Sequence, residues 1–141
     1  TESLWATMHG VHPKTDIGWT VYPRGFYDIL VRMAKETGPL PIEITENGAS
    51  YNTAPGADGR IRDAERIAYL QSHLEMVALA IRDGVPIRAY HCWSLLDNFE
   101  WAYGYTQRFG IVHVDFAGGQ RRTIKESGRW YAGVAASNRV T

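Results

Sequence analysis

The chain of 141 residues has little cysteine, no excess of charge of either sign and no long apolar run. Cys92 is the only cysteine, which excludes an internal disulfide bond and a cysteine-rich zinc site. The 15 Lys and Arg balance the 15 Asp and Glu, which argues against a nucleic-acid partner because such proteins usually carry a basic patch. The longest apolar run, Met76 to Ile81, is far shorter than the roughly 20 residues that span a bilayer, so no membrane partner is expected.

The sequence also lacks a signal-peptide pattern at its start, and together with the single cysteine this favours a cytoplasmic location. The first residue is Thr1 rather than Met, which suggests processing or excision. Disorder is disfavoured, because 45% of the residues are hydrophobic and five are tryptophan.

Hydrophobic periodicity predicts that helices and strands alternate along the chain. Proline and glycine punctuate the apolar segments at the positions where helices usually begin and end. The first half of the chain is predicted to contain a loop over residues 1–20, a helix from Pro23 to Thr37, a strand over 41–45 and a loop over 47–60. A second helix, with Asp63 as N-cap, ends at Gly84 and is followed by a strand over 85–93 and an irregular aromatic stretch over 95–109. The chain closes with a hairpin that turns at Gly118 and Gly119 and a last helix that opens with a capping box at 123–126 and ends near Ser137.

This alternation predicts an α/β fold with a parallel sheet and helices packed on it. The strand over 85–93 is apolar and aromatic on both faces, a pattern that favours burial on both sides. Two parallel strands alone leave their outer edges unpaired and part of their apolar surface uncovered. Residues 1–141 are therefore expected to be the C-terminal part of a larger α/β barrel, incomplete without an N-terminal complement that supplies the other strands.

The candidate chemistry lies where the two strands end, which is where α/β barrels place their active sites. Glu46 lies at the exit of the first strand. The second strand leads into residues 93–105, which combine Trp, Tyr and Phe side chains with the carboxylates of Asp97 and Glu100. Aromatic faces beside carboxylates suit a sugar, but from the residues alone an aromatic core is the stronger interpretation. Lys125 and its neighbours are expected to form a solvated helix face.

Two motifs resemble glycoside hydrolase family 1, the β-glucosidase family. Residues 44–48, Ile-Thr-Glu-Asn-Gly, resemble its nucleophile motif, and residues 93–101, Trp-Ser-Leu-Leu-Asp-Asn-Phe-Glu-Trp, resemble its strand-eight motif. Further matches occur in the family's order over nearly the whole chain, at residues 15–19, 22–23, 58–60, 108–110, 114–115, 122–123 and 129–131. One departure is the pair His91-Cys92, which replaces an aromatic and a small apolar residue before Trp93, and one of the two is expected to face the barrel interior.

The resemblance implies a single (β/α)8 (TIM) barrel domain, of which residues 1–141 are the C-terminal segment. It also implies a retaining β-glucosidase that needs no metal and no cofactor, with a β-glucoside as substrate. Glu46 matches the nucleophile. Trp93 matches the indole platform beneath the sugar, and Glu100 matches the carboxylate that binds the O4 and O6 hydroxyls. Trp101 matches a second hydroxyl contact, and Phe109 resembles part of the wall around the O6 end.

Trp19 resembles a residue that lines the aglycone side in the same family. Glu100 favours unmodified sugars, glucose first, because a carboxylate repels a 6-phosphate at close range. The family's acid/base glutamate lies in a Thr-x-Asn-Glu-Pro motif, which is absent from residues 1–141. An N-terminal portion of the same barrel is therefore expected to supply it. The alternative is a catalytically inactive fragment that keeps only sugar-binding or structural features.

Overall fold

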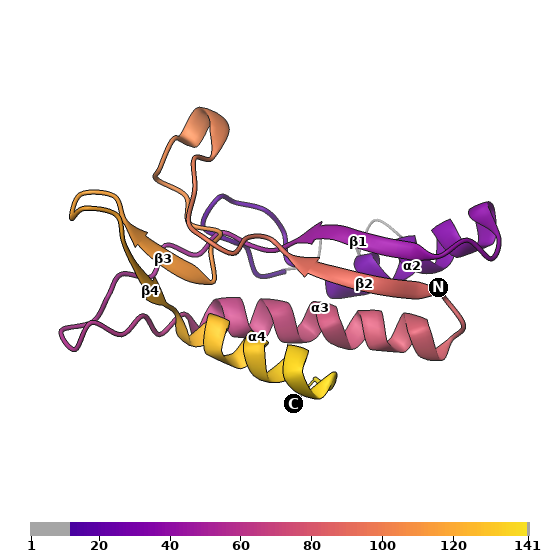
Figure 1. Cartoon of the computed structure of the whole chain (residues 1–141). Helices are drawn as coiled ribbons and strands as arrows, with labels where there is room; N and C mark the ends of the chain where they lie inside the picture. Colours follow the sequence, from indigo (N-terminus) through magenta and orange to yellow (C-terminus); the bar gives the residue numbers. More distant parts are fainter. Residues whose placement is uncertain (1–11, 141) are drawn as a thin grey trace.

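The computed structural model describes residues 12–140, so the start of the predicted loop over 1–20 lies outside the described residues. The predicted helices and strands are present, and the first strand extends two residues further than expected, so that it includes Glu46 and Asn47. In chain order the elements are α2 (Pro23–Thr37), β1 (Ile42–Asn47), α3 (Ala64–Arg82), β2 (Ile87–Cys92), the 3-10 turn η1 (Trp101–Tyr103), β3 (Val112–Asp115), β4 (Arg121–Ile124) and α4 (Glu126–Ser137) (Figure 1).

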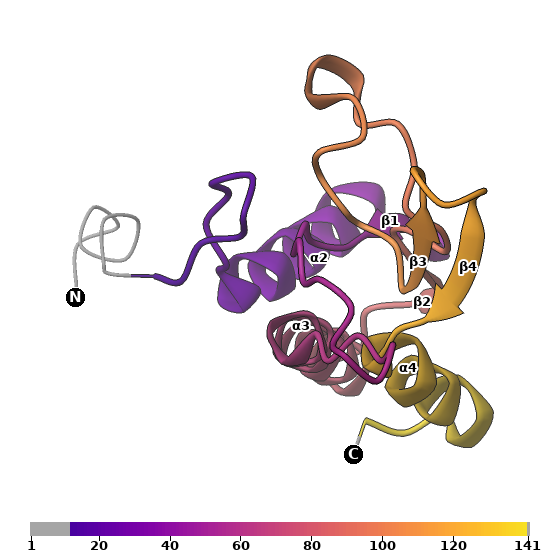
Figure 2. The same cartoon turned by 90° about the vertical axis from the view of Figure 1, so that its left-hand side faces the viewer.

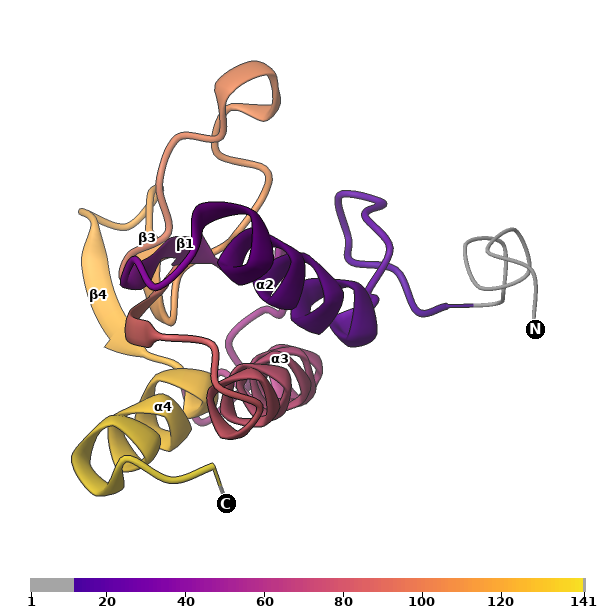
Figure 3. The same cartoon turned by 90° about the vertical axis from the view of Figure 1, so that its right-hand side faces the viewer.

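The strands β1 and β2 form the predicted parallel pair, with Ile42 opposite Ile87 and Asn47 opposite Cys92. Views along the strands place α2, α3 and α4 on one side of this pair (Figures 2 and 3). The aromatic segment around η1 and the hairpin of β3 and β4 lie beyond the carboxyl ends of β1 and β2 (Figure 1). None of the helices in the described part is long and apolar enough to cross a membrane.

The hydrophobic core lies between the β1–β2 pair and the helices α2 and α3. Alternate residues of a strand share a face, and for this reason Ile42 and Ile44 point together toward the helices. Burial of an aliphatic side chain of this size contributes about 1.5–3 kcal/mol. The buried members of this core are Leu30, Ile42, Ile44, Val77, Ala80 and Val85.

The opposite face of β1 and β2 is open, so the expectation that the second strand is buried on both sides is wrong for this chain. No residue of β2 is fully buried. Glu43 and His91 are exposed on the open face, where Glu43 Oε1 and His91 Nε2 lie 2.7 Å apart. Cys92 lies on the helix-covered face, where burial raises the pKa of its thiol to about 11. Within residues 12–140, the helices pack on one face of the pair, and the other face carries exposed side chains.

The antiparallel hairpin of β3 and β4 is present as predicted, but the capping box at 123–126 is wrong. Thr123 pairs with His113 in the hairpin, and α4 begins at Glu126 without a side-chain cap. Asp63 does precede α3, but its carboxylate caps no α3 amide and instead accepts from Arg66 and Ser127. Local motifs fail here because long-range partners outcompete the local hydrogen bonds.

The expectation of a solvated face around Lys125 is also wrong for that residue. Lys125 is 1% exposed, and its ammonium donates to Asp97 Oδ1 over 2.9 Å. Burial, with the nearby Arg66 charge, lowers the pKa of Lys125 to about 8. The neighbouring Glu126 remains partly exposed and pairs with Arg60.

Candidate active site

The adjacent ends of β1 and β2 bring Glu46 and Trp93 to the same side of the molecule. Trp93 donates its backbone N–H to the carbonyl of Asn47 over 2.9 Å, so the two strands remain joined at their carboxyl ends. Gly48 follows directly, and a Cβ atom at this position would overlap the carbonyl group of Trp93. Close approach of the two backbones therefore requires glycine after the Glu-Asn pair. The Trp93–Ser94 peptide bond is cis.

The aromatic segment after β2 folds back over the strand ends and carries Glu100 and Trp101. Glu100 closes a turn by donating its backbone N–H to the carbonyl of Gly104 over 2.6 Å. Behind the turn, the Tyr105 ring contacts both Phe99 and Phe116, at centroid separations of 5.6 and 4.4 Å. Trp101 is 83% exposed, so its indole is free to meet a molecule from outside this chain.

One open cavity of about 360 Å³ gathers all the site residues that the sequence predicts. Sugar and small-molecule sites in proteins are typically concave and combine apolar walls with a few polar groups, as this cavity does. The predicted residues in its wall are Trp19, Glu46, Trp93, Glu100, Trp101 and Phe109. Their individual roles stay predictions, but the fold brings together side chains that lie up to 90 positions apart in the sequence (109 − 19).

Trp19 reaches the cavity from the segment before α2. Its indole lies 5.7 Å from the Phe109 ring, centroid to centroid. The backbone N–H of Trp19 donates to the hydroxyl of Thr15, which is itself buried. The segment is held to the loop after β1, because Asp16 accepts from the backbone N–H of Asn52.

Asn47, Gly48 and Tyr69 also line the cavity, and sequence reasoning assigned no site role to them. Two tyrosines orient the Asn47 side chain, since its amide donates to Tyr69 and its oxygen accepts from Tyr90. Burial raises the pKa of Tyr69 to about 12, so its hydroxyl stays protonated at neutral pH. The only sequence signal for Tyr69 is its place on the predicted helix, which does not identify the strand end that it contacts.

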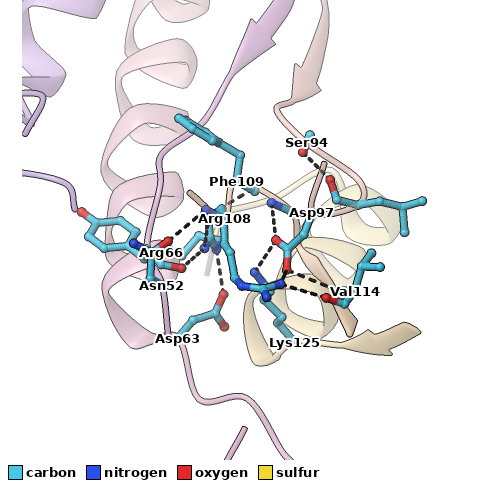
Figure 4. A network of polar contacts seen from close by, with 12 residues as sticks. Asn52, Asp63, Arg66, Ser94, Asp97, Arg108, Phe109, Val114 and Lys125 are labelled. Atoms are coloured by element: carbon cyan, nitrogen blue, oxygen red, sulfur yellow. Dashed lines mark hydrogen bonds and ion pairs between the residues drawn. The ribbon is translucent and has the colours of Figure 1, made fainter. Parts of the chain in front are cut away.

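Asp97 is not in the cavity, although the sequence grouped it with Glu100 as a carboxylate near the aromatic residues. The residue is 3% exposed, and its carboxylate accepts from Arg108, Lys125 and the backbone N–H groups of Gly110 and Val114 (Figure 4). Burial acts to raise its pKa, but the two cations outweigh burial and lower it. Asp97 therefore anchors the aromatic segment to the hairpin.

The comparisons with known proteins agree with this geometry. The family model described as glycosyl hydrolase family 1 matches residues 2–140. The chain belongs to glycosyl hydrolase family 1. Within the part of the chain that the structure describes, no group of three or more His, Cys, Asp or Glu side chains is placed to hold a metal ion.

Two curated members of glycosyl hydrolase family 1 are about half identical to this chain. β-Glucosidase A of Acetivibrio thermocellus is 51% identical over 125 residues, which are 89% of this chain and 28% of that protein. The 1,4-β-D-glucan glucohydrolase of Thermotoga neapolitana is 50% identical over 129 residues, which are 92% of this chain and 29% of that protein. The chain thus spans under a third of the length of these relatives.

A solved structure of the same family shares the fold. The family 1 β-glucosidase from Thermotoga maritima in complex with isofagomine lactam matches with a TM-score of 0.90 and 46% identity. The match covers 93% of this chain and 30% of that one. The fold of this family 1 chain therefore corresponds to a fragment of a (β/α)8 barrel.

Proposed function

We propose that residues 1–141 are the C-terminal part of a single (β/α)8 catalytic domain that acts as a retaining β-glucosidase. The observation that carries the proposal is the convergence of Glu46, Trp93, Glu100 and Trp101 on one cavity at the ends of two parallel strands. In a barrel these ends are where the chemistry takes place. The names of the relatives, β-glucosidase A and 1,4-β-D-glucan glucohydrolase, support the same activity.

In this proposal β1 and β2 are the last two strands of the barrel. The motif over residues 93–101 resembles the strand-eight motif of the family, and β1 pairs directly with β2. The open face and the outer edges of the pair are then completed by an N-terminal portion of the same barrel, which also supplies the acid/base glutamate. Without that portion the chain provides a half-site.

Glu46 is the proposed nucleophile. Its carboxylate attacks the anomeric carbon and forms a glycosyl ester while the acid of the N-terminal portion protonates the leaving oxygen. The same acid, now a base, then removes a proton from the water that attacks the ester. Retention requires the two carboxyl groups to lie roughly 5–5.5 Å apart, which leaves no room for a water between them.

The other cavity residues are proposed to bind an unmodified β-glucoside. Trp93 offers an indole face to the C–H face of the sugar, and Glu100 accepts from the O4 and O6 hydroxyls. Trp101 makes a further hydroxyl contact, Phe109 forms the wall at the O6 end, and Trp19 borders the aglycone side. These contacts accelerate the chemical step only where they are stronger in the transition state than in the bound substrate.

The test is to trap the ester. The complete barrel is incubated with a 2-deoxy-2-fluoro-β-glucoside that has a good leaving group, and intact mass is followed by peptide mapping. One fluoroglucosyl group on Glu46 is expected, and Glu46→Gln is expected to give none. An adduct on another residue contradicts the assignment of Glu46. The isolated chain is expected to give no adduct, because it lacks the rest of the barrel that completes the sugar subsite, and a sample of this chain alone then corresponds to the inactive-fragment alternative. A complete barrel that stays unlabelled counts against Glu46 as the nucleophile.

A further inference from the structure

Arg66 is a buried cation that the proposed reaction does not use. It lies on the first turn of α3 and is 1% exposed. Its Nε donates to Asp63 Oδ2 over 2.8 Å (Figure 4). Its two Nη atoms donate to four backbone carbonyl groups, those of Ala49, Tyr51, Arg108 and Phe109.

These four carbonyl groups belong to two segments that border the candidate cavity. Ala49 and Tyr51 follow Glu46 closely in the loop after β1, and Nη2 lies 2.7 Å from the carbonyl oxygen of Tyr51. Phe109 lines the cavity itself, and Nη1 lies 3.1 Å from its carbonyl oxygen. The guanidinium therefore joins the loop that follows Glu46 to the segment that carries Phe109.

The planar shape of the guanidinium matters for this arrangement. Arginine has five N–H donors in a fixed fork, and all of them are used here, one on Asp63 and four on carbonyl groups. A lysine ammonium offers three donors from a single point and cannot reproduce the fork. Asp63 is fixed in turn by the backbone N–H and the hydroxyl of Ser127 at the start of α4.

We infer that Arg66 is a positioning residue that sets substrate preference by holding the Phe109 wall against the sugar subsite. The inference rests on the proposed function, in which Phe109 faces the O6 end of the sugar. Phe109 is 2% exposed, so its ring position follows its backbone closely. A shift of its carbonyl group displaces the wall where a glucoside carries its hydroxymethyl group and a xyloside carries only hydrogen.

The test compares a β-glucoside with the matching β-xyloside in the complete barrel, with kcat and KM measured well below the unfolding temperature. Arg66→Lys keeps a charge opposite Asp63 but lacks the fork. It is expected to lower kcat/KM for the glucoside roughly tenfold more than for the xyloside, because small misplacements of binding groups have large effects on rate. The loss is expected mainly in KM, since the wall binds rather than reacts.

Two further variants keep the test decisive. Val77→Ala weakens the core behind β1 without touching either segment, and it is expected to leave the glucoside-to-xyloside ratio unchanged. The double variant Asp63→Asn, Arg66→Gln serves if Arg66→Lys fails to fold. It removes both charges together and leaves no unpaired buried charge, and the same change in the glucoside-to-xyloside ratio is expected.

Two results would show that Arg66 only stabilises the fold. One is an equal loss of kcat/KM for both substrates in the Arg66 variants, and the other is a glucoside-to-xyloside ratio that Val77→Ala changes as much as the Arg66 variants do. Wild-type enzyme that hydrolyses neither substrate overturns the proposed function and this inference with it. Wild-type turnover of the glucoside with an unchanged ratio in the Arg66 variants overturns the inference alone.

Discussion

Lys125 and Asp97 form an ion pair that is almost fully buried, with Nζ 2.9 Å from Oδ1. The pair joins the start of α4 to the aromatic segment that carries Glu100 and Trp101. Arg108 binds the other carboxylate oxygen, Oδ2, over 2.8 Å. The position of this segment in the cavity wall therefore depends on charged side chains that do not line the cavity.

Lys125→Met is expected to destabilise the fold by roughly 3–5 kcal/mol, because it leaves the Asp97 carboxylate buried with one partner fewer. Asp97→Asn combined with Lys125→Met is expected to cost less than the sum of the two single changes, since no buried carboxylate is then left behind. Urea unfolding of the single and double variants measures this. Strict additivity would contradict the coupling of the two side chains.

Gly48→Ala is expected to destabilise by about 1–3 kcal/mol or more, because the added methyl group overlaps the Trp93 carbonyl. It also separates the two strand ends, so kcat/KM is expected to fall. Gly133→Ala is the matched control. Gly133 is an exposed helical glycine with open space around it, so its replacement by alanine is expected to stabilise the protein by about 0.5–1 kcal/mol. Thermal unfolding of both variants tests the difference, and similar shifts would refute the close approach at Gly48.

The Cys92 thiol is expected to react slowly at pH 8. Burial raises its pKa to about 11, so at pH 8 the thiolate is roughly a thousandth of the total, against about a quarter for an unperturbed thiol. Alkylation by iodoacetamide, measured by mass spectrometry, is expected to be roughly a hundredfold slower in the folded protein than in urea. It is expected to accelerate as the pH rises toward 11. Equally fast labelling in both states would mean that β2 exposes the thiol.

Glu100→Gln is expected to lower kcat/KM for a β-glucoside roughly 10- to 100-fold, because hydrogen bonds to a charged group contribute about 1.5–3 kcal/mol. Relief of charge repulsion is expected to raise activity on a 6-phospho-β-glucoside relative to the glucoside. Glu36→Gln, a change at an exposed carboxylate on α2, serves as the control and leaves both values unaltered. A glucoside preference unaffected by Glu100→Gln would remove Glu100 from the sugar subsite.

Much of the site could be predicted because it depends on chain order and strand direction. Period-two and helical patterns give β1, α3 and β2, and parallel strands necessarily end at the same edge. Glu46 and Trp93 come at these ends, so their proximity follows from the sequence. The aromatic segment with Glu100 and Trp101 follows from its position directly after the second strand.

The tertiary structure alone decided which polar residues are buried and what they bind. Lys125, Asp97, Asp63 and Arg66 look like ordinary surface or capping residues in their local sequence, yet all are at most 3% exposed. Their partners lie far along the chain, 28 positions apart for Asp97 and Lys125 and 43 for Arg66 and Phe109. Local periodicity reports one face of one element, whereas burial and ion pairing arise when two elements meet, and that meeting is a property of the fold.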